Sequence, residues 1–273
     1  SFGNAVFQMA AMLVCTVLNA VLDPIFIKSI GFRGAAIATL LSQSICLLFM
    51  LVYIARKKVF RFRAVKFEKR MVGEIIAKAV PSVFQQSIPA VSTGFLTSLV
   101  SWTGITAIAA YGITGKLEII LFYPAMALNM VLTNIIGQCA GAKRSDREKD
   151  YLKYSMKIGI VLLTVLSAIV VGFSKPLSGL FLKNGEIAEI VAGYFMIVSV
   201  GYVLNTVTNC FLGTLNGLGK PIKSMLLMVF YYMIVRMPFA WFFNYLGLGL
   251  NGIWGAVLIS HIAASAAAAA AGK

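Results

Sequence analysis

The sequence contains few charged residues, and among these it has few acids and almost no histidine. Charged residues make up 12% of the 273, against roughly a quarter in soluble domains, and nine are Asp or Glu. We interpret the one histidine, His261, as a hydrogen-bonded interface residue rather than a ligand. The chain has no His-Glu-x-x-His motif, no glycine-rich phosphate loop and no carboxylate pair within an apolar segment. We therefore expect neither an enzyme nor a bound metal or organic cofactor.

Cysteine is also scarce, and its spacing excludes the common metal and redox motifs. The four cysteines, Cys15, Cys46, Cys139 and Cys210, are dispersed through apolar segments without a Cys-x-x-Cys pair. Cysteines of this kind behave as small hydrophobic side chains. We expect four buried thiols with no disulfide or metal role.

The sequence is rich in hydrophobic residues, and these form long segments. Hydrophobic residues make up 60% of the chain, and the mean hydropathy is +0.89. Apolar stretches of about 20 residues recur, which is the length that crosses a bilayer as a helix. The pattern predicts an all-α, polytopic membrane protein. Eight spans are expected, at residues 5–27, 34–54, 80–100, 105–137, 158–173, 187–212, 222–243 and from 252 to the end.

The net charge of +15 is distributed unevenly among the predicted connections. Alternate connections hold sixteen Lys and Arg residues, against four in the other set. By the positive-inside rule the rich set is cytoplasmic. We attribute this positive charge to setting the membrane topology and to contact with lipid headgroups. We do not expect nucleic acid as a partner. The rich set is Arg56, Lys57, Lys58, Arg61, Arg63, Lys66, Lys69, Arg70, Lys143, Arg144, Arg147, Lys149, Lys153, Lys157, Lys220 and Lys223, and the poor set is Lys28, Arg33, Lys175 and Lys183.

An internal repeat relates two parts of the chain. Gly3 and Pro24 lie 21 residues apart, as do Gly217 and Pro238, and a Gly-x-x-Gly-Ala element follows each proline. Both copies have the same predicted orientation, so the sequence indicates two parallel six-helix repeats. The first repeat is truncated, and four further helices are expected before Ser1.

The predicted domain organisation follows from this repeat. Residues 1–54 would be the last two helices of the N-lobe, residues 55–79 a basic cytoplasmic linker, and residues 80–273 a six-helix C-lobe. Apolar residues at helical spacing within the linker predict a helix lying on the membrane surface. They are Phe67, Met71 and Ile75.

Glu118 is the one carboxylate near the centre of a predicted span. At 1.5 Å per residue it lies roughly 20 Å along the helix that starts at Ile105. Tyr111 and Asn129 fall on the same stripe of this helix, whereas Lys116 points across it. We expect Glu118 to titrate or bind a cation, or else to form an ion pair that locks packing against another helix. If the span is misplaced, Glu118 would face lipid.

Other spans also contain polar residues and prolines. Amides inside membrane helices are expected to form interhelical hydrogen bonds, with substrate contact as the alternative. Arg236, two residues before Pro238, could extend outward, bind freed backbone carbonyls or line a cavity. Interruptions at Pro89, Pro124 and Pro238 permit bends, which suit alternating access. The candidate substrate- or ion-binding residues are Glu118, Lys116, Tyr111, Asn129, Gln85, Gln86, Asn205, Asn209 and Arg236.

Several sequence motifs occur along nearly the whole chain. The first consists of Leu22-Asp23-Pro24-Ile25-Phe26-Ile27 followed by Gly31-x-x-Gly34-Ala35-Ala36-Ile37-Ala38-Thr39. Others are Ala109-Ala110-Tyr111-Gly112, Gly137-Gln138-x-x-Gly141-Ala142 and Leu215-Asn216-Gly217-x-Gly219-Lys220-Pro221. The first resembles the fifth-to-sixth helix signature of the MATE family, the multidrug and toxic compound extrusion transporters, and the others match the family in order. On this resemblance the chain corresponds to helices five to twelve of the family's twelve.

The resemblance implies an antiporter that exports organic cations or other amphipathic compounds from a cavity between two lobes, driven by inward flow of H⁺ or Na⁺. Its partners would be the small-molecule substrate and membrane lipid, in a monomeric multi-pass protein of the bacterial plasma membrane. One branch of the family has an acidic residue where this chain has Asn205, which puts the sodium-type site of that branch in doubt. Another branch couples through an aspartate in the first helix. We interpret Asp23, before Pro24, as a local cap.

Two alternatives stay open. A flippase for lipid-linked saccharides shares the superfamily architecture, and Lys116 and Arg236 would suit its anionic cargo. A membrane scaffold without transport activity would require the buried polar residues to be dispensable. Transport assays on the intact protein separate these functions.

Overall fold

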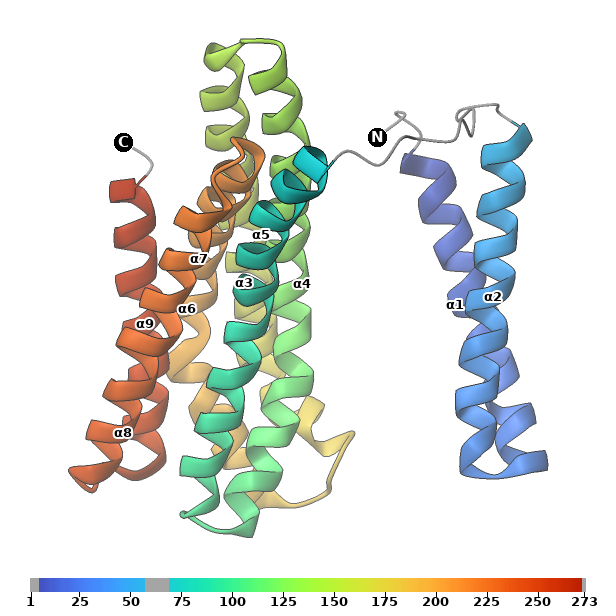
Figure 1. Ribbon diagram of the computed structural model, residues 1–273. Coiled ribbons are helices and arrows are strands. Elements are labelled where there is room, and N and C mark those ends of the chain that lie inside the picture. The colour runs from blue at the N-terminus through green and yellow to red at the C-terminus, as the bar shows by residue number, and fades with distance from the viewer. Residues whose placement is uncertain (1–4, 57–68, 272–273) are drawn as a thin grey trace. The chain divides into compact units, whose positions relative to one another are not determined.

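The computed structural model describes residues 5–56 and 69–271, and the chain divides into two compact units. Unit 1 spans Ser1–Glu68 and unit 2 spans Lys69–Lys273. The described part of each unit consists of helices joined by short connections (Figure 1), which confirms the predicted all-α fold. Several residues used above lie outside the described part, namely Gly3 of the repeat and Lys57, Lys58, Arg61, Arg63, Lys66 and Phe67 of the predicted linker.

Unit 1 is a hairpin of two long helices. Helix α1 spans Ala5–Ile30 and α2 spans Phe32–Arg56, with Gly31 between them. The buried residues of α2 are small and recur at four-residue spacing: Gly34, Ala38 and Ser42. A Cβ atom at Gly34 would collide with the backbone carbonyl of Phe26. Small residues therefore allow the two backbones to approach closely, as is usual between membrane helices.

The structure corrects the interpretation of Asp23 as a helix cap. Pro24 lies inside α1, which continues to Ile30, so Asp23 is not at a helix end. Its carboxylate Oδ1 accepts a hydrogen bond of 3.5 Å from Asn19 Nδ2, which also lies 3.4 Å from Thr39 Oγ1 of α2. Membrane helices tolerate proline because neighbouring groups compensate for the lost backbone bond.

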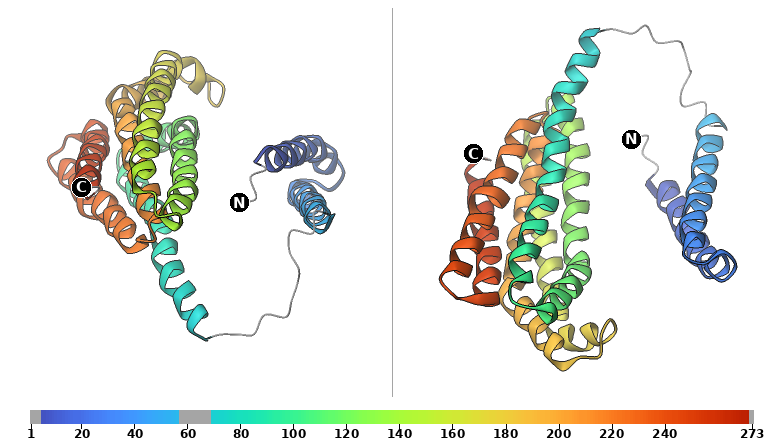
Figure 2. Two further views of the ribbon diagram at one scale, coloured as in Figure 1. Left: turned by 90° about the horizontal axis from the view of Figure 1, so that it is seen from above. Right: turned by 60° about the horizontal axis from the view of Figure 1, so that its bottom comes forward.

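Unit 2 is a bundle of long helices (Figure 2). Helix α6 packs against α4, α5 and α9, and α3 packs against α7 and α4. Helix α7, the π-helix η1 and α8 follow one another without a break. The elements are α3 (Lys69–Ser101), α4 (Ile105–Gly141), α5 (Ser145–Gly179), α6 (Gly185–Gly217), α7 (Pro221–Val229), η1 (Phe230–Arg236), α8 (Met237–Tyr245) and α9 (Gly249–Ala271).

Among the described residues, seven helices are long and apolar enough to cross a membrane. One of the seven is the continuous segment Pro221–Tyr245. Helix α3 is also long, but it is not among them, so the eighth span stays a prediction. It begins at Lys69 rather than Val80, and Met71 and Ile75 therefore belong to α3 itself and not to a separate linker helix.

The helices extend past the predicted apolar segments. Helix α5 has 35 residues. At 1.5 Å per residue this is about 52 Å, whereas the hydrocarbon core of a bilayer is about 30 Å thick. The basic residues from Arg147 to Lys157, which the sequence placed in a connection, form the first turns of α5. The basic residues therefore did not mark the end of the helix, and the side of the membrane on which they lie stays a prediction.

A π-helical segment precedes Pro238. The Met237 N–H donates to the Tyr232 carbonyl oxygen, five residues back, instead of to the residue four back. π-Helices are rare, and they frequently occur at functional sites. Pro89 and Pro124, by contrast, lie inside α3 and α4, which are each continuous.

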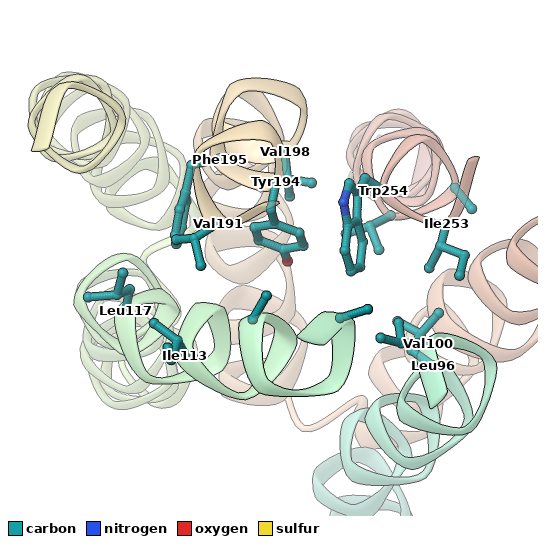
Figure 3. Packing of buried hydrophobic residues seen from close by; sticks show 14 of the residues in the cluster. Leu96, Val100, Ile113, Leu117, Val191, Tyr194, Phe195, Val198, Ile253 and Trp254 are labelled. Atoms are coloured by element: carbon teal, nitrogen blue, oxygen red, sulfur yellow. The ribbon is translucent and has the colours of Figure 1, made fainter. Parts of the chain in front are cut away.

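The main core of unit 2 lies between α3, α4, α6 and α9 (Figure 3). Its largest side chains are aromatic, with Tyr194 and Phe195 from α6 and Trp254 from α9. Between α4 and α6 the backbones also approach closely, because a Cβ atom at Gly213 would lie 2.5 Å from the Asn129 carbonyl oxygen. Lipid is as apolar as these side chains, so close packing is what holds membrane helices together.

The four cysteines are free thiols, as expected, but they differ in burial. Cys139 and Cys210 are buried, whereas Cys15 and Cys46 are only half-buried. The expectation of four buried thiols was therefore wrong for unit 1. Within unit 1 the two cysteines have only the two helices of the hairpin to cover them.

Candidate functional site

Glu118 lies on α4 where that helix packs against α6. Its Oε1 atom accepts hydrogen bonds from the hydroxyl groups of Tyr194 and Tyr202, both on α6. The two hydroxyl oxygens are 3.3 Å apart. Glu118 is half-buried, whereas Tyr194 is 2% exposed and Tyr202 is fully buried. Two neutral donors therefore satisfy a carboxylate that would be costly to place in a membrane without partners.

The spacing of the two tyrosines explains how both reach one carboxylate. They are eight residues apart. Eight residues make slightly more than two helical turns, so both side chains stand on the same face of α6. Figure 3 shows the Tyr194 ring extending from α6 toward α4, the helix that carries Ile113 and Leu117. The α4–α6 contact thus fixes the position of the carboxylate.

Aromatic rings surround this group. Tyr111, one of the predicted site residues, stacks on Trp254 of α9 at 5.6 Å between ring centroids and 17° between planes. The Trp254 ring meets Tyr194 edge-on at 4.8 Å and 86°. Phe122 meets Tyr202 in the same way at 5.7 Å. Stacked and edge-on rings limit side-chain rotation, and their faces offer negative potential to a cation.

Arg236 lies in a second polar group, formed by η1 and α9. The side chain is 6% exposed. Its Nε atom donates to Ser260 Oγ at 2.9 Å, and Nη2 donates to the Tyr231 hydroxyl at 2.8 Å. The guanidinium also lies over the ring of Tyr232, 4.5 Å from its centroid. Of the roles left open for Arg236, extension outward and binding of backbone carbonyls are thus not found.

His261 belongs to the same group and is a hydrogen-bonded interface residue. It is 1% exposed, and its Nδ1 lies 2.6 Å from the Tyr231 hydroxyl. Arg236 Nη2 lies 3.4 Å from Nε2 of the same ring. The Tyr231 hydroxyl thus contacts both the imidazole and the guanidinium.

The two polar groups are adjacent without forming an ion pair. The rings of Tyr202 and His261 are 5.7 Å apart. Within the described residues no carboxylate lies within ion-pair distance of the Arg236 guanidinium. The polar group around Glu118 and the polar group around Arg236 are therefore separated by the rings of Tyr202 and His261.

The predicted amides form a hydrogen-bonded group of their own between α4 and α6. Asn129 Nδ2 donates to Asn209 Oδ1 at 3.2 Å, and Asn209 Nδ2 donates to the Asn205 carbonyl oxygen at 3.0 Å. The Nδ2 atom of Asn205 is buried and has no hydrogen-bond partner among the described residues. The Asn129–Asn209 bond joins α4 to α6, whereas the bond between Asn209 and Asn205 lies within α6.

Three other candidates are not brought to Glu118. Lys116 is exposed, which agrees with its direction across α4. Gln86 is exposed and Gln85 is half-buried on α3, and neither side chain has a hydrogen bond within the part of unit 2 that is described. In the described residues none of the three has a hydrogen bond to Tyr194 or Tyr202.

The sequence-based candidates missed the partners of Glu118. Tyr194 and Tyr202 were not selected, because they lie on a different helix from Glu118, whereas Tyr111 was selected for sharing its stripe of α4. Their eight-residue spacing was a usable signal, since it places two hydroxyl groups on one helix face. Tyr231 and Ser260, the partners of Arg236, carried no signal of this kind. Across residues 5–56 and 69–271 no group of three or more His, Cys, Asp or Glu side chains is placed to hold a metal ion.

Comparison with known proteins places this fold in a family. The MatE family model matches residues 81–242, which is most of unit 2 and more than half of the chain. The chain belongs to the MATE family. MATE proteins are transporters, so the resemblance of the motifs and the expectation of a non-enzymatic, multi-pass membrane protein are confirmed.

Relatives of this MATE chain have several assigned cargoes. A FAD transporter of Shewanella oneidensis is 25% identical over 271 residues, covering 96% of this chain and 60% of the relative. A multidrug export protein, MepA of Staphylococcus aureus, is 27% identical over 284 residues, covering 98% and 60%. The chain thus spans about three fifths of the length of these relatives.

Solved structures agree with this assignment. An outward-facing multidrug resistance MATE family transporter of the MOP superfamily matches with a TM-score of 0.92 and 25% identity, covering 99% of this chain and 62% of that one. A MOP superfamily transporter from Pyrococcus furiosus, reported to have a binding pocket of reverse polarity, matches with a TM-score of 0.93 at 25% identity and the same coverage.

Proposed function

We propose that this chain is the greater part of an ion-coupled multidrug antiporter that exports organic cations or amphipathic compounds by alternating access of two lobes. The observation that carries the proposal is Glu118, a carboxylate within the bundle of unit 2 that accepts hydrogen bonds from Tyr194 and Tyr202. The named relatives at about a quarter identity include multidrug export proteins, which supports this substrate class.

Glu118 would alternate between two states during transport. In the ionised state it accepts both tyrosine hydroxyl bonds, and it attracts an organic cation whose apolar parts lie against the half-buried ring of Tyr111, which stacks on Trp254. A proton that binds to the carboxylate removes this charge and weakens the hold on the cation. Entry of the proton from one side and release of the cation to the other would then be coupled.

Among the two coupling ions that the family resemblance allows, we propose the proton. A proton needs a single acceptor oxygen, whereas a metal cation needs a shell of oxygen ligands. The oxygen atoms that bond the Glu118 carboxylate in the described residues are two tyrosine hydroxyls, and these already donate to it. Asn205 in place of an acidic residue is consistent with this choice.

A second candidate function is transport of an anionic compound. It is favoured by Arg236, which is buried in unit 2 without an ion pair to a carboxylate in the described residues. A relative named as a FAD transporter and the reverse-polarity pocket of the Pyrococcus furiosus transporter are compatible with such cargo. The flippase alternative belongs to this class, because its cargo is also anionic.

One experiment separates these functions. The intact protein is reconstituted in liposomes, and efflux of a fluorescent organic cation is measured under a proton gradient and, separately, under a sodium gradient. Glu118→Gln should abolish proton-driven efflux, because glutamine keeps the shape and cannot titrate. Glu189→Gln, an exposed glutamate on α6, is the matched control and should transport normally. Efflux of FAD but not of the cation would favour the anionic function, and no transport of either would favour a scaffold.

A further inference from the structure

Cys15 of α1 and Cys46 of α2 reach reciprocally across the hairpin of unit 1. The Cys15 thiol donates to the Ser42 carbonyl oxygen at 3.1 Å. The Cys46 thiol donates to the Ala11 carbonyl oxygen at 3.8 Å. Ala11 is one helical turn before Cys15, and Ser42 is one turn before Cys46. Each sulfur therefore lies against the turn of helix that carries the other sulfur.

The small residues of α2 make this pairing possible. Gly34, Ala38 and Ser42 are followed at the same four-residue spacing by Cys46, so the cysteine continues the surface on which α1 packs. Each thiol bonds a backbone carbonyl of the facing helix, one turn from the other cysteine. Both are free rather than joined in a disulfide.

An apolar cavity of about 240 Å³ lies beside the two thiols. Both cysteines line it, together with Phe7, Val14, Leu18, Ile45 and Phe49. An apolar cavity of roughly 150 Å³ is sufficient to hold a benzene molecule. The space next to the sulfurs is therefore large enough for one aromatic ring, and its walls offer no partner for a charged group.

We propose that Cys15 and Cys46 form a dithiol site for trivalent arsenic compounds that carry an apolar substituent. Sulfur is a soft ligand that prefers soft centres. With phenylarsine oxide, two As–S bonds form and the arsenic–oxygen bond breaks, and the oxygen leaves as water with the two thiol protons. Arsenic keeps its oxidation state, so the step needs no oxidant or reductant. The phenyl ring would occupy the cavity. This site is independent of the function proposed for Glu118.

The other two cysteines provide an internal control. Cys210 of α6 packs against Leu132 and Ile136 of α4, in a cluster that contains no second thiol among its described members. Cys139 is buried near the end of α4. A single thiol forms one As–S bond, which lacks the chelate advantage of a pair.

The test uses the full chain in detergent and phenylarsine oxide as the probe. In a Cys139→Ala/Cys210→Ala variant, one equivalent of the probe should remove both remaining thiols from the native protein, as counted by a thiol reagent after denaturation. Intact mass should increase by one phenylarsenic group. Adding Cys15→Ala or Cys46→Ala should weaken retention of the probe about tenfold or more, as expected for loss of a second, intramolecular bond.

Two further measurements keep the outcome clear. A dithiol such as dithiothreitol should reverse the reaction, whereas an equal concentration of a monothiol should not. Peptide mapping of the unsubstituted protein should locate arsenic on Cys15 and Cys46, which removes any dependence on how the variants fold. The proposal is overturned if single-cysteine variants retain the probe equally well, or if both thiols stay free in the native protein.

Discussion

The Tyr202 hydroxyl donates a hydrogen bond to the Glu118 carboxylate, and the Tyr202 ring lies 5.7 Å from the ring of His261. One tyrosine thus contacts the acidic group through its hydroxyl and the basic group through its ring. His261 in turn contacts Arg236 through Nε2 and Tyr231 through Nδ1. This arrangement makes Tyr202 the residue at which the two polar groups of unit 2 can be tested together.

The first prediction concerns the coupling between Tyr202 and Glu118. Tyr202→Phe removes one donor and keeps the ring, so we expect it to lower the free energy of unfolding by about 1.5–3 kcal/mol, the range for a hydrogen bond to a charged group. Combined with Glu118→Gln, the two effects should depart from additivity by at least about 0.5 kcal/mol, because both substitutions remove the same bond. Thermal unfolding in detergent supplies the four values. Tyr151→Phe, on the exposed surface of α5, is the control.

The second prediction concerns the two hydrogen bonds that the Arg236 guanidinium donates in different directions. Arg236→Lys keeps the positive charge, but an ammonium cannot bond Ser260 and Tyr231 in the same directions and lies less well over Tyr232. We expect a loss of stability of about 1–3 kcal/mol, visible as a lower Tm. Arg70→Lys, whose side chain is 90% exposed, should leave Tm unchanged. Equal Tm values for all three proteins would mean that the Arg236 bonds do not stabilise the fold.

Composition and pattern predicted the parts of this fold that depend on a single helix. Apolar length identified the helices, and the position of Glu118 within one of them drew attention to the residue. The partners of Glu118 could not be predicted in the same way, because they depend on which faces of α4 and α6 meet. That contact is set by close packing at Gly213, a feature of two helices rather than of one.

The wrong interpretation of Asp23 has a similar cause. Asp before Pro ends many helices in water, where a side-chain cap competes with the continuing helix. In an apolar medium an unpaired backbone group is costly, so a helix continues through proline when neighbours allow it. Helix α1 follows the second rule, and Asp23 bonds with Asn19 inside the helix. The Asp-Pro sequence is compatible both with a helix end and with a continuing helix. The apolar surroundings of α1 favour the continuing helix.

The third prediction tests the close approach of α4 and α6. A Cβ atom at Gly213 would lie 2.5 Å from the Asn129 carbonyl oxygen, so Gly213→Ala must push the helices apart. We expect a loss of about 1–3 kcal/mol, the usual cost of overpacking, together with disruption of the Asn129–Asn209 hydrogen bond. Gly193→Ala is the matched control on the same helix, since its Cβ would meet nothing within 4 Å. It should be neutral or stabilising by up to about 1 kcal/mol. If both alanines have equal effects, steric contact does not explain the glycine at 213.

The last prediction concerns orientation in the membrane. The connection between α4 and α5 holds Lys143 and Arg144, and the first turns of α5 add further basic residues, whereas the connection between α5 and α6 holds Lys183. Because positively charged segments are retained in the cytoplasm, α5 should run from inside to outside. In a background where the four native cysteines are alanine, Ser145→Cys should react with a membrane-impermeant maleimide only after cells are permeabilised.

Lys183→Cys should react on intact cells, and labelling of both variants after permeabilisation controls for burial of the new thiol. Both positions are exposed on the surface of unit 2, so accessibility to the reagent is governed by the membrane alone. Labelling of Ser145→Cys from outside intact cells would reverse the orientation. Glu118 would keep its place between α4 and α6, but the cytoplasmic and external ends of its helix would exchange. The direction in which a proton reaches Glu118 would then have to be reassigned.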